Sequence, residues 1–111
     1  MDRFWERSPE WLRERELQVA FEAARDAKER AGRQVLLCVE LGELTGPVWK
    51  RDRTDYIAAV EAYEAAFDDW DAAEKAFQAS PAGQAYHRWL YRRAADPIAR
   101  EAAATPEEIA A

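Results

Sequence analysis

Apolar and aromatic residues recur at helical spacing between Thr54 and Ala79. Successive members of the row are separated by four, three, four, three and seven positions, which places their side chains along one face of an α-helix. We therefore predict an amphipathic helix over residues 54–79, with Thr54 as its N-cap, and expect the rest of the chain to pack against its aromatic face. The row consists of Tyr56, Val60, Tyr63, Phe67, Trp70 and Phe77.

The same predicted helix carries a row of acidic residues. At about 100° per residue, this row lies roughly a quarter-turn round the helix from the aromatic row. Charged rows of this kind are commonly solvated. The pattern also suits docking on a basic groove of another protein or, as a third interpretation, a divalent-metal site. The candidate docking residues are Glu61, Glu64, Asp68, Asp69 and Asp71.

A second long helix is predicted in the N-terminal part of the chain. Ser8-Pro9-Glu10 combines a hydroxyl N-cap, a proline at the first helical position and an acid in the first turn. Apolar residues then keep helical spacing as far as Leu41, although Gly32 could end the helix. Three interpretations remain open: one helix of about 36 residues, two helices joined near Gly32, or a short strand at Val35–Val39, which contains two β-branched residues.

Proline-containing motifs divide the remainder of the chain. Thr45-Gly46-Pro47 predicts a break, and the charged residues Lys50–Arg53 that follow predict a connector. Ser80-Pro81 and Asp96-Pro97 repeat the cap-plus-proline signal, so we expect helices over residues 81–95 and 97–103. Residues 1–8 and 104–111 are expected to be frayed tails.

These elements predict an all-α fold in one helical domain spanning residues 1–111, a length that suits a single hydrophobic core. We expect a small helical bundle built on a long helical hairpin, with a shorter C-terminal helix folding back. The predicted core consists of Trp11, Leu17, Phe21, Leu37, Leu41, Trp49, Val60, Tyr63, Phe67, Trp70, Trp89 and Leu90.

The net charge of the chain is unevenly distributed. It is −6 at pH 7, and the whole of this excess falls within residues 54–80, whereas residues 1–53 and 81–111 are each balanced. An acidic balance argues against direct affinity for DNA, RNA or an anionic membrane surface. It suits a protein partner with a basic surface, or no partner at all.

Residue types that carry catalysis or bind metals are scarce. Cys38 is the only cysteine and His87 the only histidine, so neither a disulfide nor a zinc-ligand set can be assembled within the chain. We interpret Cys38 as a buried small hydrophobic residue of a cytoplasmic protein, and His87 as a surface or core-edge residue. The first ten residues are charged and no apolar run reaches ~18 residues, so neither a signal peptide nor a membrane span is expected.

Basic and aromatic residues are interleaved in the segment 86–93, a pattern found in proteins that bind single-stranded nucleic acid. If the helices that flank Ser80-Pro81 lie antiparallel, Asp68 and Asp71 come within reach of the basic residues of this segment. We therefore expect an internal charge match across a helical hairpin, and keep direct nucleic-acid binding as the alternative. The basic residues concerned are Arg88, Arg92 and Arg93.

The string Glu40-Leu41-Gly42-Glu43-Leu44 resembles the Glu-x-x-Glu motif of the all-α NTP pyrophosphohydrolases, the MazG-like and dimeric dUTPase superfamily. The second motif of that superfamily would fall on Glu61-Ala62-Tyr63-Glu64, with Glu in place of the usual Asp, so the resemblance covers about residues 34–64. It implies that Glu40, Glu43, Glu61 and Glu64 hold Mg²⁺ for nucleotide hydrolysis, since carboxylate oxygens are suitable ligands for that ion.

The leading functional hypothesis is a small, acidic, non-catalytic protein-interaction module that needs no cofactor. It would dock its acidic helix on the basic, nucleic-acid-binding surface of a partner protein, for instance as a phage-like inhibitor of the anti-defence or anti-CRISPR type. Two alternatives stay open: the Mg²⁺-dependent pyrophosphohydrolase, and a structural subunit of a larger assembly. The aromatic row is also long enough to support a homodimer.

Overall fold

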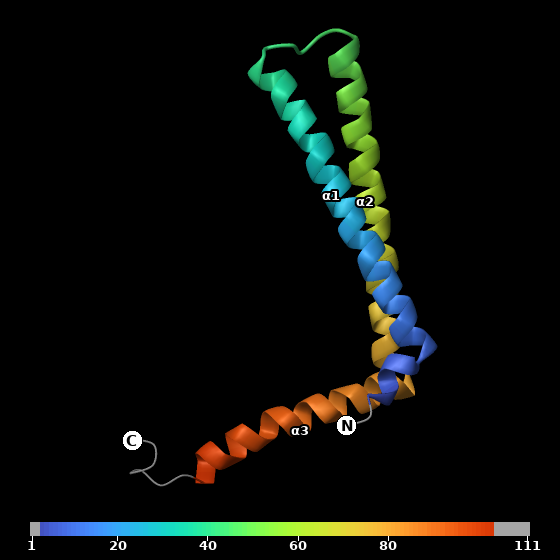
Figure 1. Ribbon diagram of the computed structural model, residues 1–111, viewed down its shortest axis with the longest axis vertical. Coiled ribbons are helices and arrows are strands. Elements are labelled where there is room, and N and C mark those ends of the chain that lie inside the picture. Colours follow the sequence, from blue (N-terminus) through green and yellow to red (C-terminus); the bar gives the residue numbers. More distant parts are fainter. Residues whose placement is uncertain (1–2, 104–111) are drawn as a thin grey trace.

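The computed structural model describes the backbone of residues 3–103 and the side chains of residues 3–97, and within these ranges it contains helices and no strand (Figure 1). The all-α prediction is therefore confirmed, whereas the predicted tail at 104–111 lies outside the described residues. The elements are the 3-10 helix η1 (Phe4–Arg7) and the α-helices α1 (Pro9–Glu40), α2 (Pro47–Ala79) and α3 (Pro81–Ala103).

Helices α1 and α2 form the predicted long hairpin, and α3 leaves its end at a steep angle (Figure 1). The molecule is elongated, with extents of 71 × 41 × 19 Å. Its radius of gyration is 23.0 Å, whereas a compact chain of this length has about 13 Å. We call the α2–α3 junction at Ser80 the elbow. Instead of lying along the hairpin, α3 packs its first turns on η1 and on the end of α2.

Of the three interpretations of the N-terminal half, the single helix is the one observed. Helix α1 runs for 32 residues and passes through Gly32 without a break. Its N-terminus is capped as predicted, because the Ser8 hydroxyl accepts a hydrogen bond of 3.1 Å from the backbone N–H of Trp11. Gly32 faces the partner helix, where a Cβ atom would lie 3.4 Å from the Tyr56 ring. This glycine therefore belongs to the helix–helix contact and does not end α1.

The start of α2 differs from the prediction. The break at Thr45-Gly46-Pro47 is present, but the helix begins at Pro47, and Thr54 is an interior residue rather than the N-cap. The predicted connector Lys50–Arg53 forms the second turn of α2. Pro47 explains the early start, since its fixed φ suits the first turn of a helix and it has no N–H to leave unpaired. Gly46, with φ +108°, provides the left-handed turn before it.

Helix α3 also runs further than predicted. Ser80 caps it as expected, with its hydroxyl accepting from the N–H of Gly83 at 3.0 Å. Pro97, however, lies inside the helix, so the predicted division into 81–95 and 97–103 is wrong. Asp96 and Pro97 are both exposed. A proline inside a helix removes one backbone hydrogen bond and crowds the carbonyl oxygen four residues earlier, and α3 continues past it nevertheless. The cap-plus-proline signal at Asp96-Pro97 was therefore misleading.

The two long helices meet along a seam with a seven-residue period. In α2 an aromatic ring occupies every seventh position, and an alanine occupies the seam position between each pair of rings. All of these residues are at least partly buried, so large and small side chains alternate along the contact as in a coiled coil. The rings are Tyr56, Tyr63, Trp70 and Phe77, the α2 alanines are Ala59, Ala66 and Ala73, and α1 contributes Ala24 and Ala31.

The best-buried part of the molecule lies at the elbow. Trp5 is only 3% exposed, and its ring centroid lies 5.3 Å from that of Tyr86 and 5.1 Å from that of Trp89. The Trp11 and Phe77 rings meet beside this group at 5.2 Å. The expected frayed tail at residues 1–8 thus contains an ordered turn, η1, which packs an aromatic side chain onto α3.

Several residues of the predicted core are exposed. They are apolar, but a two-helix hairpin has no third layer to cover them, and α3 turns away from it. Leu37 is 48% exposed, Leu41 63%, Phe67 46% and Leu90 39%. Among the residues whose burial is described, the buried hydrophobic side chains are Trp5, Cys38, Ala73 and Phe77.

Candidate functional site

The predicted acidic row lies on the part of α2 that α1 leaves uncovered. Glu61, Glu64 and Asp68 are exposed, and the helical period places them well round the helix from the seam. Asp69, which follows Asp68 in the sequence, is exposed as well. Asp71 is partly buried and forms an ion pair with Lys75, one turn later, with 2.8 Å between the Asp71 Oδ2 and Lys75 Nζ atoms.

This ion pair is local to α2. The hydrogen bond and the negative charge of Asp71 raise the pKa of Lys75, so the pair stays intact at neutral pH. Both side chains remain solvated, and such i, i+4 pairs contribute little to stability. Among the described side chains, no ion pair is formed by Glu61, Glu64 or Asp68, the three exposed carboxylates of the row.

The predicted charge match between α2 and α3 is not formed. Helix α3 leaves the elbow at a steep angle (Figure 1). Among the side chains of residues 3–97, no ion pair joins Asp68 or Asp71 to Arg88, Arg92 or Arg93. The Arg93 guanidinium instead lies 4.8 Å from the ring centroid of Trp89 on its own helix. Arg88 and Arg92 are exposed. Tyr86 and Trp89 pack their rings against Trp5 of η1, whereas Tyr91 is 73% exposed, so the elbow explains part of the interleaved pattern.

The carboxylates implied by the pyrophosphohydrolase resemblance are not brought together. Gly32 lies against Tyr56 and Trp11 against Phe77, and in both pairs the residue numbers add to 88. Glu40 therefore lies across from about residue 48, thirteen positions or about 20 Å along α2 from Glu61. Within the described part of the chain, no three acidic, histidine or cysteine side chains form a group that could hold a metal ion.

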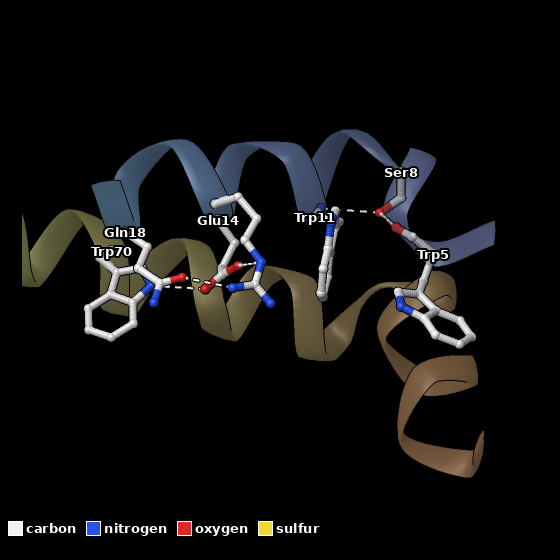
Figure 2. A network of polar contacts seen from close by, with 7 residues as sticks. Trp5, Ser8, Trp11, Glu14, Gln18 and Trp70 are labelled. Atoms are coloured by element: carbon white, nitrogen blue, oxygen red, sulfur yellow. Dashed lines mark hydrogen bonds and ion pairs between the residues drawn. The ribbon is translucent and has the colours of Figure 1, made fainter. Parts of the chain in front are cut away.

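Polar side chains occupy the seam at three levels, which sequence reasoning missed. Glu14 is 8% exposed and accepts a hydrogen bond of 3.0 Å from the indole Nε1–H of Trp70, as Figure 2 shows. The Lys28 ammonium lies 4.2 Å from the ring centroid of Tyr63. The sequence does contain a signal for these polar seam positions. Glu14 and Lys28 each lie seven residues from Phe21, so all three occupy the same position of the seven-residue period.

The third polar level lies near the closed end of the hairpin. The Cys38 thiol donates a hydrogen bond of 3.4 Å to Asp52, and both side chains are buried. Burial raises the pKa of Cys38, and the hydrogen bond to Asp52 and the charges of Asp52 and Glu43 raise it further. The thiol therefore stays protonated and unreactive at neutral pH. This agrees with the interpretation of Cys38 as a buried residue and adds a specific polar partner to it.

Replacing Trp70 with phenylalanine is expected to lower the free energy of unfolding by about 1–3 kcal/mol, because the carboxylate of Glu14 loses its indole donor while remaining buried. Urea denaturation followed by circular dichroism measures the change. Glu14→Leu in the same background should recover part of the loss, since it removes the carboxylate oxygen that has lost its indole donor, although it also removes the 3.5 Å ion pair between Glu14 and Arg15. Equal stability of the Trp70→Phe variant and the wild type would contradict a structural role for this hydrogen bond.

A second surface, which we call the apolar tip, lies at the closed end of the hairpin. Figure 1 shows α1 and α2 diverging toward the loop that joins them. Large apolar side chains there are about half exposed or more, in contrast to the seam further down. The tip consists of Leu36 (59% exposed), Leu37 (48%), Val39 (48%), Leu41 (63%), Leu44 (50%) and Val48 (48%).

His87 lies at the edge of the elbow core, with its ring centroid 5.8 Å from that of Tyr86, in agreement with the expected core-edge position. None of the helices in the described part of the chain has the length and apolar character needed to cross a membrane. Comparison with known proteins finds no similar family model, curated protein or solved structure.

Proposed function

We propose that this protein is a non-catalytic interaction module that docks the acidic row of α2 on a basic surface of a partner protein. The observation that carries the proposal is the concentration of charge. The whole net charge of −6 falls within residues 54–80. Glu61, Glu64 and Asp68 are exposed there, on the part of α2 that faces away from α1.

Helix α2 is continuous through the acidic row, which supports the proposed docking. The row from Glu61 to Asp68 spans two turns, or about 10 Å, which is close to the Debye length at physiological salt. Its carboxylates therefore act together on an approaching positive surface. Complementary charge on two preformed surfaces raises the rate of association and favours the correct partner over others.

An inhibitor is a concrete form of such a module. A basic groove that binds the phosphate backbone of a nucleic acid can also bind a helix with a row of negative charge. By covering that groove, the protein would exclude nucleic acid from its partner, as an inhibitor of the anti-defence or anti-CRISPR type would do. The charge and the small size of the chain support this form of the proposal.

The test compares two triple charge reversals in a pull-down from a lysate of the source organism. Glu61→Lys, Glu64→Lys and Asp68→Lys reverse the acidic row. Glu16→Lys, Glu22→Lys and Asp26→Lys make the same change in net charge on exposed positions of α1. We expect the wild type and the α1 variant to retain one partner protein, and the α2 variant to lose it while keeping its helical circular dichroism spectrum.

The partner, once identified and purified, provides the quantitative test. Its association rate with the wild type should fall steeply between low and high salt, because the interacting charges are exposed. Competition by short DNA or RNA would then show whether the shared surface is a nucleic-acid groove. Retention of the partner by the α2 variant, or an association rate that does not depend on salt, would overturn the proposal.

A further inference from the structure

We propose that two copies of this chain form a homodimer through the apolar tip. The chain exposes a large area for its mass. The chain exposes 8331 Å², whereas a folded monomer of 12.7 kDa is expected to expose about 6,200 Å². The excess of about 2,100 Å² belongs to the whole elongated chain, of which the tip is one part, and it exceeds the about 800 Å² per partner that a standard-size contact buries.

Apolar residues lie on all sides of α1 at the tip. Residues 35–39 are all apolar, and at about 100° per residue five consecutive positions pass completely round the helix. Helix α2 covers one side, where Cys38 is buried, and leaves the others open. A helix that is apolar on all sides is typical of a buried position. The end of α1 therefore lacks neighbours on the sides that α2 does not reach.

The charges around the tip favour a second copy as the neighbour. The tip carries both signs of charge, with Glu40 and Glu43 at the end of α1 and in the loop, and Lys50 and Arg53 in the first turns of α2. All four are exposed. In a two-fold symmetric contact, residue i meets residue j and j meets i, so a surface with separated acids and bases is complementary to itself. The acidic row of the proposed partner-docking face lies outside this region and stays free.

The test measures the mass of the full-length protein in solution by sedimentation equilibrium. We expect twice the chain mass of 12.7 kDa. Leu37→Glu with Leu41→Glu should raise the dimer dissociation constant about a hundredfold or more, because each copy would then bury two unpaired carboxylates in the contact. The matched control is Leu12→Glu with Val19→Glu, at similarly exposed positions of α1 far from the tip, and it should leave the dimer intact.

A charge-exchange experiment tests the symmetry. Glu40→Lys with Glu43→Lys, and Lys50→Glu with Arg53→Glu, should each weaken the homodimer, whereas an equal mixture of the two variants should form a heterodimer. A monomeric wild type would overturn the proposal, as would a dimer that survives the Leu37 and Leu41 changes. Equal loss of the dimer in the Leu37/Leu41 variant and in the Leu12/Val19 control would show that the contact does not lie at the tip. A mixture that stays monomeric would overturn the two-fold arrangement. These variants leave Glu61–Asp68 unchanged, so failure here is distinct from failure of the proposed function.

Discussion

Replacing Gly83 with alanine is expected to destabilise the elbow, although the same change normally stabilises a helix. A Cβ atom at residue 83 would overlap the carbonyl oxygen of Phe77 and lie 2.6 Å from its carbonyl carbon. Because these are backbone atoms, no side-chain rotation can relieve the contact, and the α2–α3 junction has to open. We expect the free energy of unfolding to fall toward the upper end of the about 1–3 kcal/mol that overpacking costs.

The matched control for this change is Gly32→Ala in α1. There the new methyl group meets the Tyr56 ring at an ordinary contact distance of 3.4 Å. The loss of glycine's conformational freedom in the unfolded chain should then stabilise the protein by about 0.5–1 kcal/mol. Urea denaturation of both variants measures the two effects. Stabilisation by both changes would show that helix propensity, rather than the close approach of Gly83 to Phe77, governs the elbow.

Trp5→Ala is expected to have the largest effect of any single substitution considered. The Trp5 side chain is 3% exposed and touches the Tyr86 and Trp89 rings of α3, so its removal leaves a cavity that the surrounding rings cannot close. Truncation of a buried tryptophan costs about 3–5 kcal/mol. Since the contacts lie at the elbow, we expect the loss to be concentrated in η1 and the first turns of α3.

Hydrogen exchange locates this loss. Amide protection should fall in the first turns of α3 and persist in the middle of α1 and α2, where the seam is unchanged. Phe4→Ala is the matched control, because Phe4 belongs to the same short helix but is 48% exposed, and its effect should be much smaller. Unaltered protection of α3 in the Trp5→Ala variant would mean that η1 does not hold α3 in place.

The parts of the fold that local signals determine were predictable from the sequence. The hydroxyl-plus-proline motifs at Ser8 and Ser80 mark true helix starts, and continuous apolar spacing through Gly32 corresponds to one helix. Charged residues misled the prediction at Lys50–Arg53, because a solvated helix turn and a connector have the same polar composition. The decisive residue there is Asp52, which lies in the seam and pairs with Cys38.

The packing was less predictable, because it depends on residues with weak individual signals. Alanines such as Ala66 add little hydrophobicity, so the predicted row included Phe67, which lies at the edge of the seam, and left out the small residues between the rings. The pattern predicts Leu37 and Leu41 in the core, but they are exposed, because apolar character alone does not show whether a neighbouring element covers a residue. The direction of α3 depends on Trp5 and Gly83, whose contacts have no periodic pattern.

Because α1 and α2 share a seven-residue period, the hairpin can change length without disturbing the seam only in steps of seven residues per helix. Taking seven residues from α1 and the facing seven from α2 would move the closed end about 10 Å nearer to the elbow and keep its direction. Taking three or four would rotate one end of the molecule relative to the other. Homologues of this protein are therefore expected to differ in hairpin length by multiples of seven residues per helix, with the elbow sequence unchanged.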